Sequence, residues 1–225
     1  MKVKFGAIIV GGSGKIGGHV ASKNRAGAYL RTKVTPTNPN TASQSAVRGI
    51  LSSLSKSWGD LSDAQRLSFN NAVASFATTD IFGDIKNPSG FNLYVRLGAN
   101  AIAAGELPAT TAPAKVAIPY AAVSNASMDA SAGTLSIGFS NTDLNDRVIR
   151  VTATKVLGPG VSFAKSEFRV IAVVGVADDV ASCGTSYVVK FGSFNAGDNI
   201  QVGVQVLDPT GQTSTIQIVK ATVVA

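Results

Sequence analysis

The chain has 225 residues, of which 45% are hydrophobic and 15% are charged, so it can form one large domain or two small ones around a buried core. Its single cysteine, Cys183, and single histidine, His19, exclude an internal disulfide, a Cys/His zinc site and a histidine-based hydrolase. No apolar run approaches the roughly 18 residues of a membrane-spanning helix, and the stretch from Phe5 to Val10 is too short for a signal peptide, so we expect neither.

The net charge of +7 is concentrated at one end of the chain. Residues 1–50 contain eight Lys and Arg residues and no Asp or Glu, whereas the rest of the chain carries a net charge of −1. A basic loop that served only solubility would not need the interleaved apolar residues Tyr29 and Leu30. We therefore expect an acidic partner, either a protein surface or nucleic acid. The candidate partner-binding residues are Lys15, His19, Lys23, Arg25, Tyr29, Arg31 and Lys33.

Residues 1–40 are predicted to form an extended basic arm or a short irregular hairpin. Each glycine of this segment would destabilise a helix by about 1 kcal/mol. The segment ends in the turn-forming run from Pro36 to Asn40. We therefore expect no helix before residue 41.

Residues 41–105 are predicted to form a small module of three short helices. Thr41 with Gln44, and Ser62 with Gln65, have the spacing of capping boxes at helix N-termini, and a third helix is expected near Ser89. Apolar residues then follow at helical spacing, and Trp58 is expected in the core. The three predicted faces are Val47, Ile50, Leu51, Leu54 and Trp58; Ala64, Leu67, Ala72, Val73 and Phe76; and Phe91, Tyr94, Leu97, Ala101 and Ile102.

Residues 106–119 are rich in Pro, Ala and Thr, which predicts a linker without regular structure between two domains. Residues 120–225 are rich in β-branched residues separated by turn formers, and they predict an immunoglobulin- or fibronectin-like β-sandwich. The Cys…Trp…Cys pattern of antibody domains is absent. The predicted class is therefore a multidomain α+β protein. Strands are expected at 134–139, 147–156, 168–174, 187–191, 199–206 and 214–219.

Gly12 to Gly17 matches the G-x-G-x-x-G pattern of dinucleotide-binding loops. In such folds an acidic residue about 20 positions further on binds the ribose, but the first acidic residue here is Asp60, and no βαβ alternation follows. Gly14-Lys15 is not a phosphate-binding Walker loop either, because Ile16 stands where Ser or Thr would bind magnesium. We expect no cofactor, and a nicotinamide-dependent reductase is an alternative that a cofactor-binding assay should exclude.

The sequence contains no convincing catalytic or metal-binding constellation. Asp178 and Asp179 are expected to be solvated turn carboxylates, and Asp80 and Asp84 are expected to cap or turn the chain. Cys183, beside a glycine, is expected to be a small inert residue. We therefore expect neither an enzyme nor a bound metal.

Four segments together resemble a known family: Gly11–Gly18, Ala21–Arg31, Pro36–Gln44 and Trp58–Arg66. They are similar to an N-terminal module of tailed-phage and prophage proteins, those of crAss-like phages among them. In that module a G-G-x-V-x-S-x-N-R-x-G-x-Y-x-R run leads to N-P-x-T-x-x-Q and then W-x-x-L-x-x-x-Q-R, often followed by immunoglobulin-like domains. The resemblance covers roughly residues 10–100, and the strand-rich region matches only in architecture.

The resemblance implies a virion structural protein and supplies no catalytic residue. The expected role is a capsid-associated protein of the auxiliary, decoration or head-fibre type, anchored by residues 1–40. Alternatives are a tail or neck component, or a nucleic-acid-binding protein that uses the basic arm. Expected partners are further copies of the chain and other virion proteins such as capsid or tail proteins.

Overall fold

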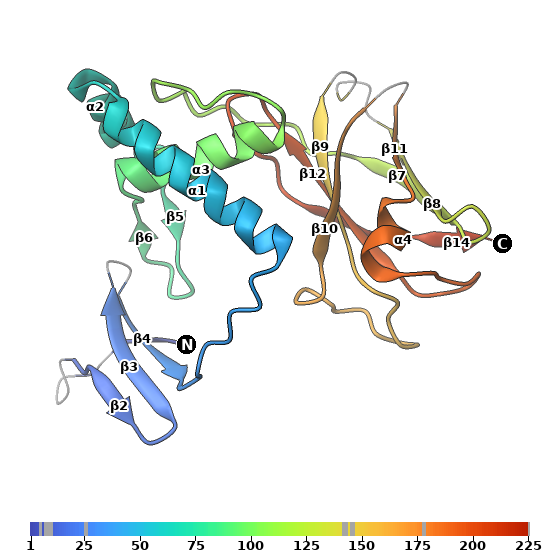
Figure 1. The fold of residues 1–225 in the computed structure, drawn as a ribbon, viewed down its shortest axis with the longest axis horizontal. Helices are drawn as coiled ribbons and strands as arrows, with labels where there is room; N and C mark the ends of the chain where they lie inside the picture. The colour runs from blue at the N-terminus through green and yellow to red at the C-terminus, as the bar shows by residue number, and fades with distance from the viewer. Residues whose placement is uncertain are drawn as a thin grey trace.

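The computed structural model describes residues 1–4, 6, 11–24, 27–140, 144, 147–176 and 179–224. Over these residues the chain is a mixed α+β protein in which most of the regular structure is β-sheet. Figure 1 shows a small sheet near the N-terminus, a group of helices, and two larger sheets near the C-terminus. The expected α+β class is therefore confirmed.

The basic N-terminal segment forms a four-stranded antiparallel sheet, which we call the N-terminal sheet. Its order is β1-β4-β3-β2. The segment is therefore more regular than the extended arm or irregular hairpin that the sequence predicted. Gly17, with φ of 55°, and Gly18 form the two-residue turn between β2 and β3, a connection that matches the twist of a hairpin. The strands are β1 (Lys2–Val3), β2 (Gly14–Ile16), β3 (His19–Asn24) and β4 (Gly27–Thr32).

Three helices follow a segment, residues 33–41, that contains neither helix nor strand. They are α1 (Ala42–Asp60), α2 (Asp63–Ala72) and α3 (Gly90–Ala103). Both predicted capping boxes are confirmed, because the hydroxyls of Thr41 and Ser62 each accept a hydrogen bond from the backbone N–H three residues later, both at 3.3 Å. Ser89 caps α3 in the same way at 3.1 Å.

The helices share a small core centred on α3. Leu54, Phe69 and Leu93 are buried there, and the Trp58 ring packs against Phe69 at 5.9 Å and Tyr94 at 5.4 Å between centroids, so the core role of Trp58 is confirmed. The wider predicted faces are wrong in part. Four of their members are exposed because α3 covers only one side of α1 and α2: Val47, Leu51, Ala64 and Leu67.

A two-stranded hairpin lies between α2 and α3, where the sequence predicted no strands. It consists of β5 (Thr78–Thr79) and β6 (Ile85–Lys86). Asp80 turns the chain between them, since its Oδ1 accepts hydrogen bonds from the N–H groups of Phe82 at 2.8 Å and Asp84 at 3.1 Å. The expected turn role of Asp80 is confirmed.

Residues 106–119 contain neither helix nor strand, as predicted, but they are fastened to the parts on either side. The N–H of Ala112 donates to Ser68 Oγ of α2 at 3.1 Å, and the N–H of Val116 donates to Gln212 Oε1 at 3.0 Å. This linker is therefore a strap that touches both the helices and the strand-rich region.

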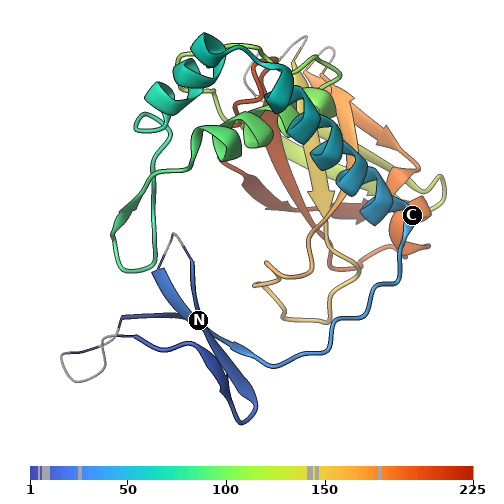
Figure 2. The same ribbon diagram turned by 60° about the vertical axis from the view of Figure 1, so that its left-hand side comes forward.

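The strand-rich region forms two four-stranded sheets that enclose one core (Figures 1 and 2). One sheet has the order β10-β9-β12-β13 and the other β11-β8-β7-β14; β14 runs parallel to β7, and the other pairings are antiparallel. Met128, Ile137, Val151 and Val204 are fully buried between them. The strands are β7 (Val123–Asp129), β8 (Thr134–Phe139), β9 (Val148–Ala153), β10 (Arg169–Gly175), β11 (Val180–Gly184), β12 (Gln201–Leu207), β13 (Gln217–Lys220) and β14 (Thr222–Val224).

The strand predicted at 187–191 is wrong, because these residues form the short helix α4 (Ser186–Phe191). Tyr187 is fully buried, and its OH donates to the carbonyl of Thr154 at 3.0 Å. Its ring packs on Phe191 and Phe194, with centroids 5.1 and 5.3 Å away. A helical turn places Tyr187 and Phe191 on one face, which closes the end of the sandwich core.

Candidate functional site

The N-terminal sheet has almost no core of its own. Ala21, at 4% exposure, is the one buried residue among the described residues 1–34. Figure 2 shows the sheet set apart from the sandwich, beside the β5–β6 hairpin, with residues 33–41 crossing to α1. Both faces of this sheet are therefore open to a partner over most of their area.

The strand register divides the predicted residues between the two faces. Lys15 pairs with Val20, which pairs with Arg31, so Lys15 and Arg31 point to the same side. Tyr29, two residues before Arg31, shares that side. His19 and Lys23 point to the opposite side. The predicted set is thus not one site: one face combines two cations with an aromatic ring, and the other carries a lysine and the lone imidazole.

The two remaining candidates lie at the margins. Lys33 directly follows β4, and its N–H donates to the carbonyl of Gly18 at 2.8 Å, so it continues the β3–β4 ladder. Arg25 lies outside the described residues. The described residues of the sheet include no acidic side chain, so its cations have no carboxylate within the sheet.

Two lysines that the sequence analysis did not select attach the N-terminal sheet to the β5–β6 hairpin. Lys2 Nζ lies 3.4 Å from Asp80 Oδ2, and Lys4 Nζ lies 2.9 Å from Asp84 Oδ2. Lys4 Nζ also lies 5.2 Å from the centroid of the Phe82 ring, within cation–π range. Sequence reasoning treated Asp80 and Asp84 as turn residues and had no signal for partners nearly 80 residues away.

The Asp80 carboxylate is held in its ionised form. Burial opposes ionisation, but hydrogen bonds from the backbone N–H groups of Phe82 and Asp84, together with the Lys2 ammonium, outweigh it. The pKa of Asp80 is therefore lower than the ordinary value of an aspartate. This carboxylate both stabilises the turn of the hairpin and holds the N-terminal sheet through Lys2.

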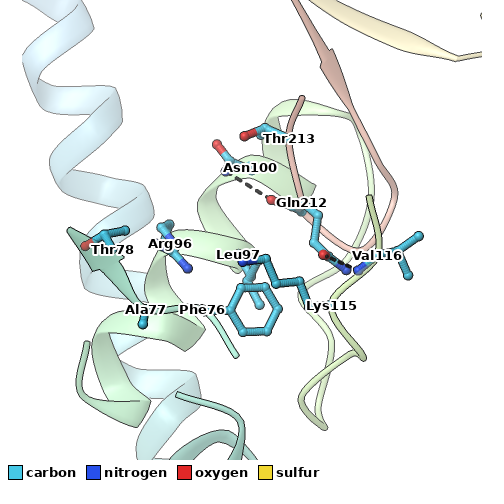
Figure 3. Close-up of a pocket in the computed structure, with 11 residues that line it drawn as sticks. Phe76, Ala77, Thr78, Arg96, Leu97, Asn100, Lys115, Val116, Gln212 and Thr213 are labelled. Atoms are coloured by element: carbon cyan, nitrogen blue, oxygen red, sulfur yellow. Dashed lines mark hydrogen bonds between the residues drawn. The ribbon is translucent and has the colours of Figure 1, made fainter. Parts of the chain in front are cut away.

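A second candidate site is a cavity of about 230 Å³ where the helices, the strap and the sandwich meet (Figure 3). Two cations define its chemistry. Arg96 Cζ lies 5.7 Å and Lys115 Nζ 5.8 Å from the centroid of the Phe76 ring, and Figure 3 shows Lys115 next to that ring with Arg96 to one side. The lining contains no acidic residue. It consists of residues 76–78, 115–116 and 211–213 with Arg96, Leu97 and Asn100 of α3.

Hydrogen bonds fix the walls of this pocket. Asn100 Nδ2 donates to the carbonyl of Gly211 at 3.0 Å, while Arg150 Nη2 donates to Asn100 Oδ1 at 2.9 Å. The buried Gln212 side chain donates from Nε2 to the carbonyl of Ala114 at 2.8 Å. Gly211, with φ of 81°, packs so tightly that a Cβ there would overlap the carbonyl of Leu97. The pocket is therefore preformed by the contact between α3 and the turn after β12.

The remaining candidate residues, where the structure describes them, are not arranged as a catalytic or cofactor-binding site. Cys183 is buried in the sandwich, and burial raises the pKa of its thiol to about 11, as expected for an inert residue. Asp178 lies outside the described residues, and Asp179 has a positive φ of 58° just before β11. The segment after the G-x-G-x-x-G pattern is strand β3, and the apolar run 5–10 before it lies outside the described residues except Gly6.

Two searches of the described ranges gave negative results. No three His, Cys, Asp or Glu side chains in that part of the chain gather as a metal site requires. Of the helices described there, none combines the length and the hydropathy needed to cross a bilayer.

Comparison with known proteins finds little similarity. No family model and no curated protein matches the chain. Among solved structures, it is similar to a Fn3-like protein from Clostridium thermocellum, with 11% identity and a TM-score of 0.31. The match covers 49% of this chain and 97% of that one.

Proposed function

We propose that this chain is a structural protein of a phage virion, associated with the capsid as an auxiliary, decoration or head-fibre component. The assignment to a virion rests on the resemblance of residues 10–100 to tailed-phage proteins. The observation that favours an anchoring role is the N-terminal sheet, which is basic, free of carboxylates over its described residues, and almost without a core.

The stability of the N-terminal sheet depends on what covers it. A small sheet without a covered hydrophobic face is only marginally stable in water, so it gains most when it lies on another surface. Lys15 and Arg31 on one face suit an acidic protein surface, which would supply the carboxylates that the sheet lacks. β2 lies at the edge of the sheet, where a strand of a neighbouring subunit can be added.

The proposed roles of the chain segments follow from the two separate hydrophobic cores. One hydrophobic cluster is formed by the helices and the other by the sandwich. In this proposal residues 1–40 anchor the protein, residues 41–105 are a bracket, residues 106–119 connect, and residues 120–225 form a displayed immunoglobulin- or fibronectin-like domain. Several copies, as a homo-oligomer or in a repeated array, would occupy equivalent positions on the particle.

The location is tested directly on particles. Phage particles whose genome encodes this sequence are purified on a density gradient, washed in high salt, and labelled with gold-conjugated antibody against residues 120–225. Gold on the heads supports the proposal, and gold on tails or necks supports the alternative location. Washed particles that carry neither gold nor peptides of this chain by mass spectrometry would overturn the virion assignment.

The anchor is tested by rebinding. Particles stripped of the protein are incubated with the purified chain and with the K15E/R31E variant, which reverses two charges on one face of the N-terminal sheet. We expect the variant to lose at least tenfold in affinity, because each substitution turns an attraction into a repulsion. The matched control K165E/K190E makes the same charge change on the sandwich and should bind like the native chain. Equal binding by all three proteins would exclude this face as the anchor.

A nucleic-acid-binding role is the second candidate, because Lys15, Arg31 and Tyr29 share one face. Cations there can contact phosphates while the tyrosine stacks on a base. Fluorescence anisotropy with labelled single- and double-stranded DNA, at two salt concentrations, measures it. Binding that weakens with salt and is lost in K15E/R31E would support this role. Absence of binding at low salt would exclude it.

A further inference from the structure

We propose that the pocket between α3, the strap and the turn after β12 binds a small organic carboxylate. This inference is independent of the virion role, because it rests on a part of the molecule that the proposed anchor does not use. Its basis is the pair of cations, Arg96 and Lys115, that face one aromatic ring without an acidic partner in the lining.

Arg96 and Lys115 concentrate positive charge in the pocket. Two positive groups near the centroid of Phe76 repel each other, and neither makes an ion pair with a described carboxylate. An anion placed between them would relieve this repulsion and accept charge-assisted hydrogen bonds from both. The planar guanidinium of Arg96 matches the two oxygens of a carboxylate in particular.

The rest of the lining selects the body of the ligand. Phe76 and Leu97 supply apolar surface beneath the cations, while the hydroxyl of Thr213 is a further polar group at the rim. The volume of about 230 Å³ lies below the roughly 300 Å³ at which pockets for drug-sized ligands begin. A single ring or short chain with one carboxylate fits this description, and a nucleotide is too large.

The walls are rigid enough for selective binding. Asn100 is hydrogen-bonded on both sides, to Gly211 and to Arg150, so the α3 wall and the turn wall are held together. The buried Gln212 side chain bonds to the strap at Ala114 and Val116. A preformed pocket binds without the cost of ordering its walls.

The experiment uses the full chain labelled with ¹⁵N. Benzoate, the neutral benzamide and inorganic phosphate are titrated at constant ionic strength, and the backbone amides of Leu97, Gly211 and Thr213 are followed by NMR. We expect saturable shifts with benzoate, and binding at least tenfold weaker with benzamide and with phosphate. Equal binding of benzamide would overturn recognition of the anion, and tighter binding of phosphate would overturn the carboxylate assignment.

Variants assign the binding to the two cations. R96Q and K115Q should each weaken benzoate binding by about tenfold, the value of one lost charge-assisted hydrogen bond. K165Q, which removes an exposed lysine of the sandwich, should leave it unchanged. Both variants change exposed side chains, and their amide spectra report whether the fold is retained. Benzoate binding that survives in a folded R96Q/K115Q double variant would exclude this pocket.

Discussion

At the scale of single residues, Asp80 links two parts of the molecule through one carboxylate. Its Oδ1 accepts the N–H groups of Phe82 and Asp84, which closes the hairpin, and its Oδ2 accepts Lys2, which holds the N-terminal sheet. All three interactions favour the ionised form. The hairpin and the sheet are therefore expected to respond to the protonation of the same group.

The first prediction is the pH dependence of this link. Because the pKa of Asp80 in the folded protein is below its unfolded value of about 3.9, the carboxylate stabilises the fold above that pH. The contribution is lost as the pH falls through the folded pKa. NMR titration of the Asp80 carboxyl carbon and the Phe82 amide should give a common midpoint below 3.9. K2Q should move the midpoint upward, and a midpoint at or above 3.9 in the native chain would contradict this account.

The second prediction concerns Gly211. Its φ of 81° is unfavourable for any other residue, and a Cβ would also overlap the Leu97 carbonyl. Gly160 has nearly the same φ, 80°, but has nothing within reach of a Cβ, so it isolates the backbone effect. G211A should lower the free energy of unfolding by about 2 to 4 kcal/mol, and G160A by about 1 kcal/mol. Urea denaturation measures both, and equal losses would show that the close approach to α3 costs nothing.

At the scale of elements, local signals in the sequence predicted helix starts well and strands unevenly. The capping boxes at Thr41 and Ser62 are short-range patterns, and the structure forms them as expected. β11 was missed because its alternation uses small residues: Ala181 and Cys183 are buried, but they give little strand preference. Residues 187–191 were misassigned because their β-branched run fits a strand as well as a helical turn.

Two signals could have corrected the error at α4. Tyr187 and Phe191 are four residues apart, the spacing of one helical face, and Val189 between them is 84% exposed. Gly192, with φ of 90°, follows the last helical residue, where glycine is favoured. The decisive contact, however, is the hydrogen bond from Tyr187 to Thr154, which depends on how the chain packs.

The third prediction tests that bond. Tyr187→Phe keeps the buried ring and removes the hydroxyl that satisfies the carbonyl of Thr154. The free energy of unfolding should fall by about 1 to 2 kcal/mol, because a buried acceptor loses its partner. Tyr29→Phe, at a half-exposed ring of the N-terminal sheet, is the control and should change little. Thermal denaturation of the three proteins compares them, and an unchanged Tyr187→Phe stability would mean that the hydroxyl is not needed to close the core.

At the scale of the whole molecule, the candidate site could be only half predicted. Composition located the basic segment, and Gly17-Gly18 is a hairpin signal within it. The separation of Lys15 and Arg31 from His19 and Lys23 needs the register of four strands. The cationic pocket could not be predicted from the sequence, because Phe76, Arg96 and Gln212 meet only through the packing of three separate segments.

The last prediction concerns how the N-terminal sheet is held. The pairs Lys2–Asp80 and Lys4–Asp84 are the described ion pairs between the sheet and the hairpin, and the connection through residues 33–41 has no regular structure. The Lys4–Asp84 pair is exposed and is screened by salt, whereas the Asp80 side chain of the other pair is 3% exposed and is screened less. K2E/K4E places like charges against Asp80 and Asp84, so the sheet should detach and stay detached at every salt concentration.

Small-angle scattering and hydrogen exchange measure this detachment. The K2E/K4E variant should have a larger radius of gyration than the native chain at low salt, and the amides of Thr78–Lys86 should exchange faster. The native chain should approach the variant as salt is raised. The control K165E/K190E makes the same charge change on the sandwich, away from these pairs, and it should remain docked. If K2E/K4E keeps the native dimensions, contacts other than the two ion pairs hold the sheet.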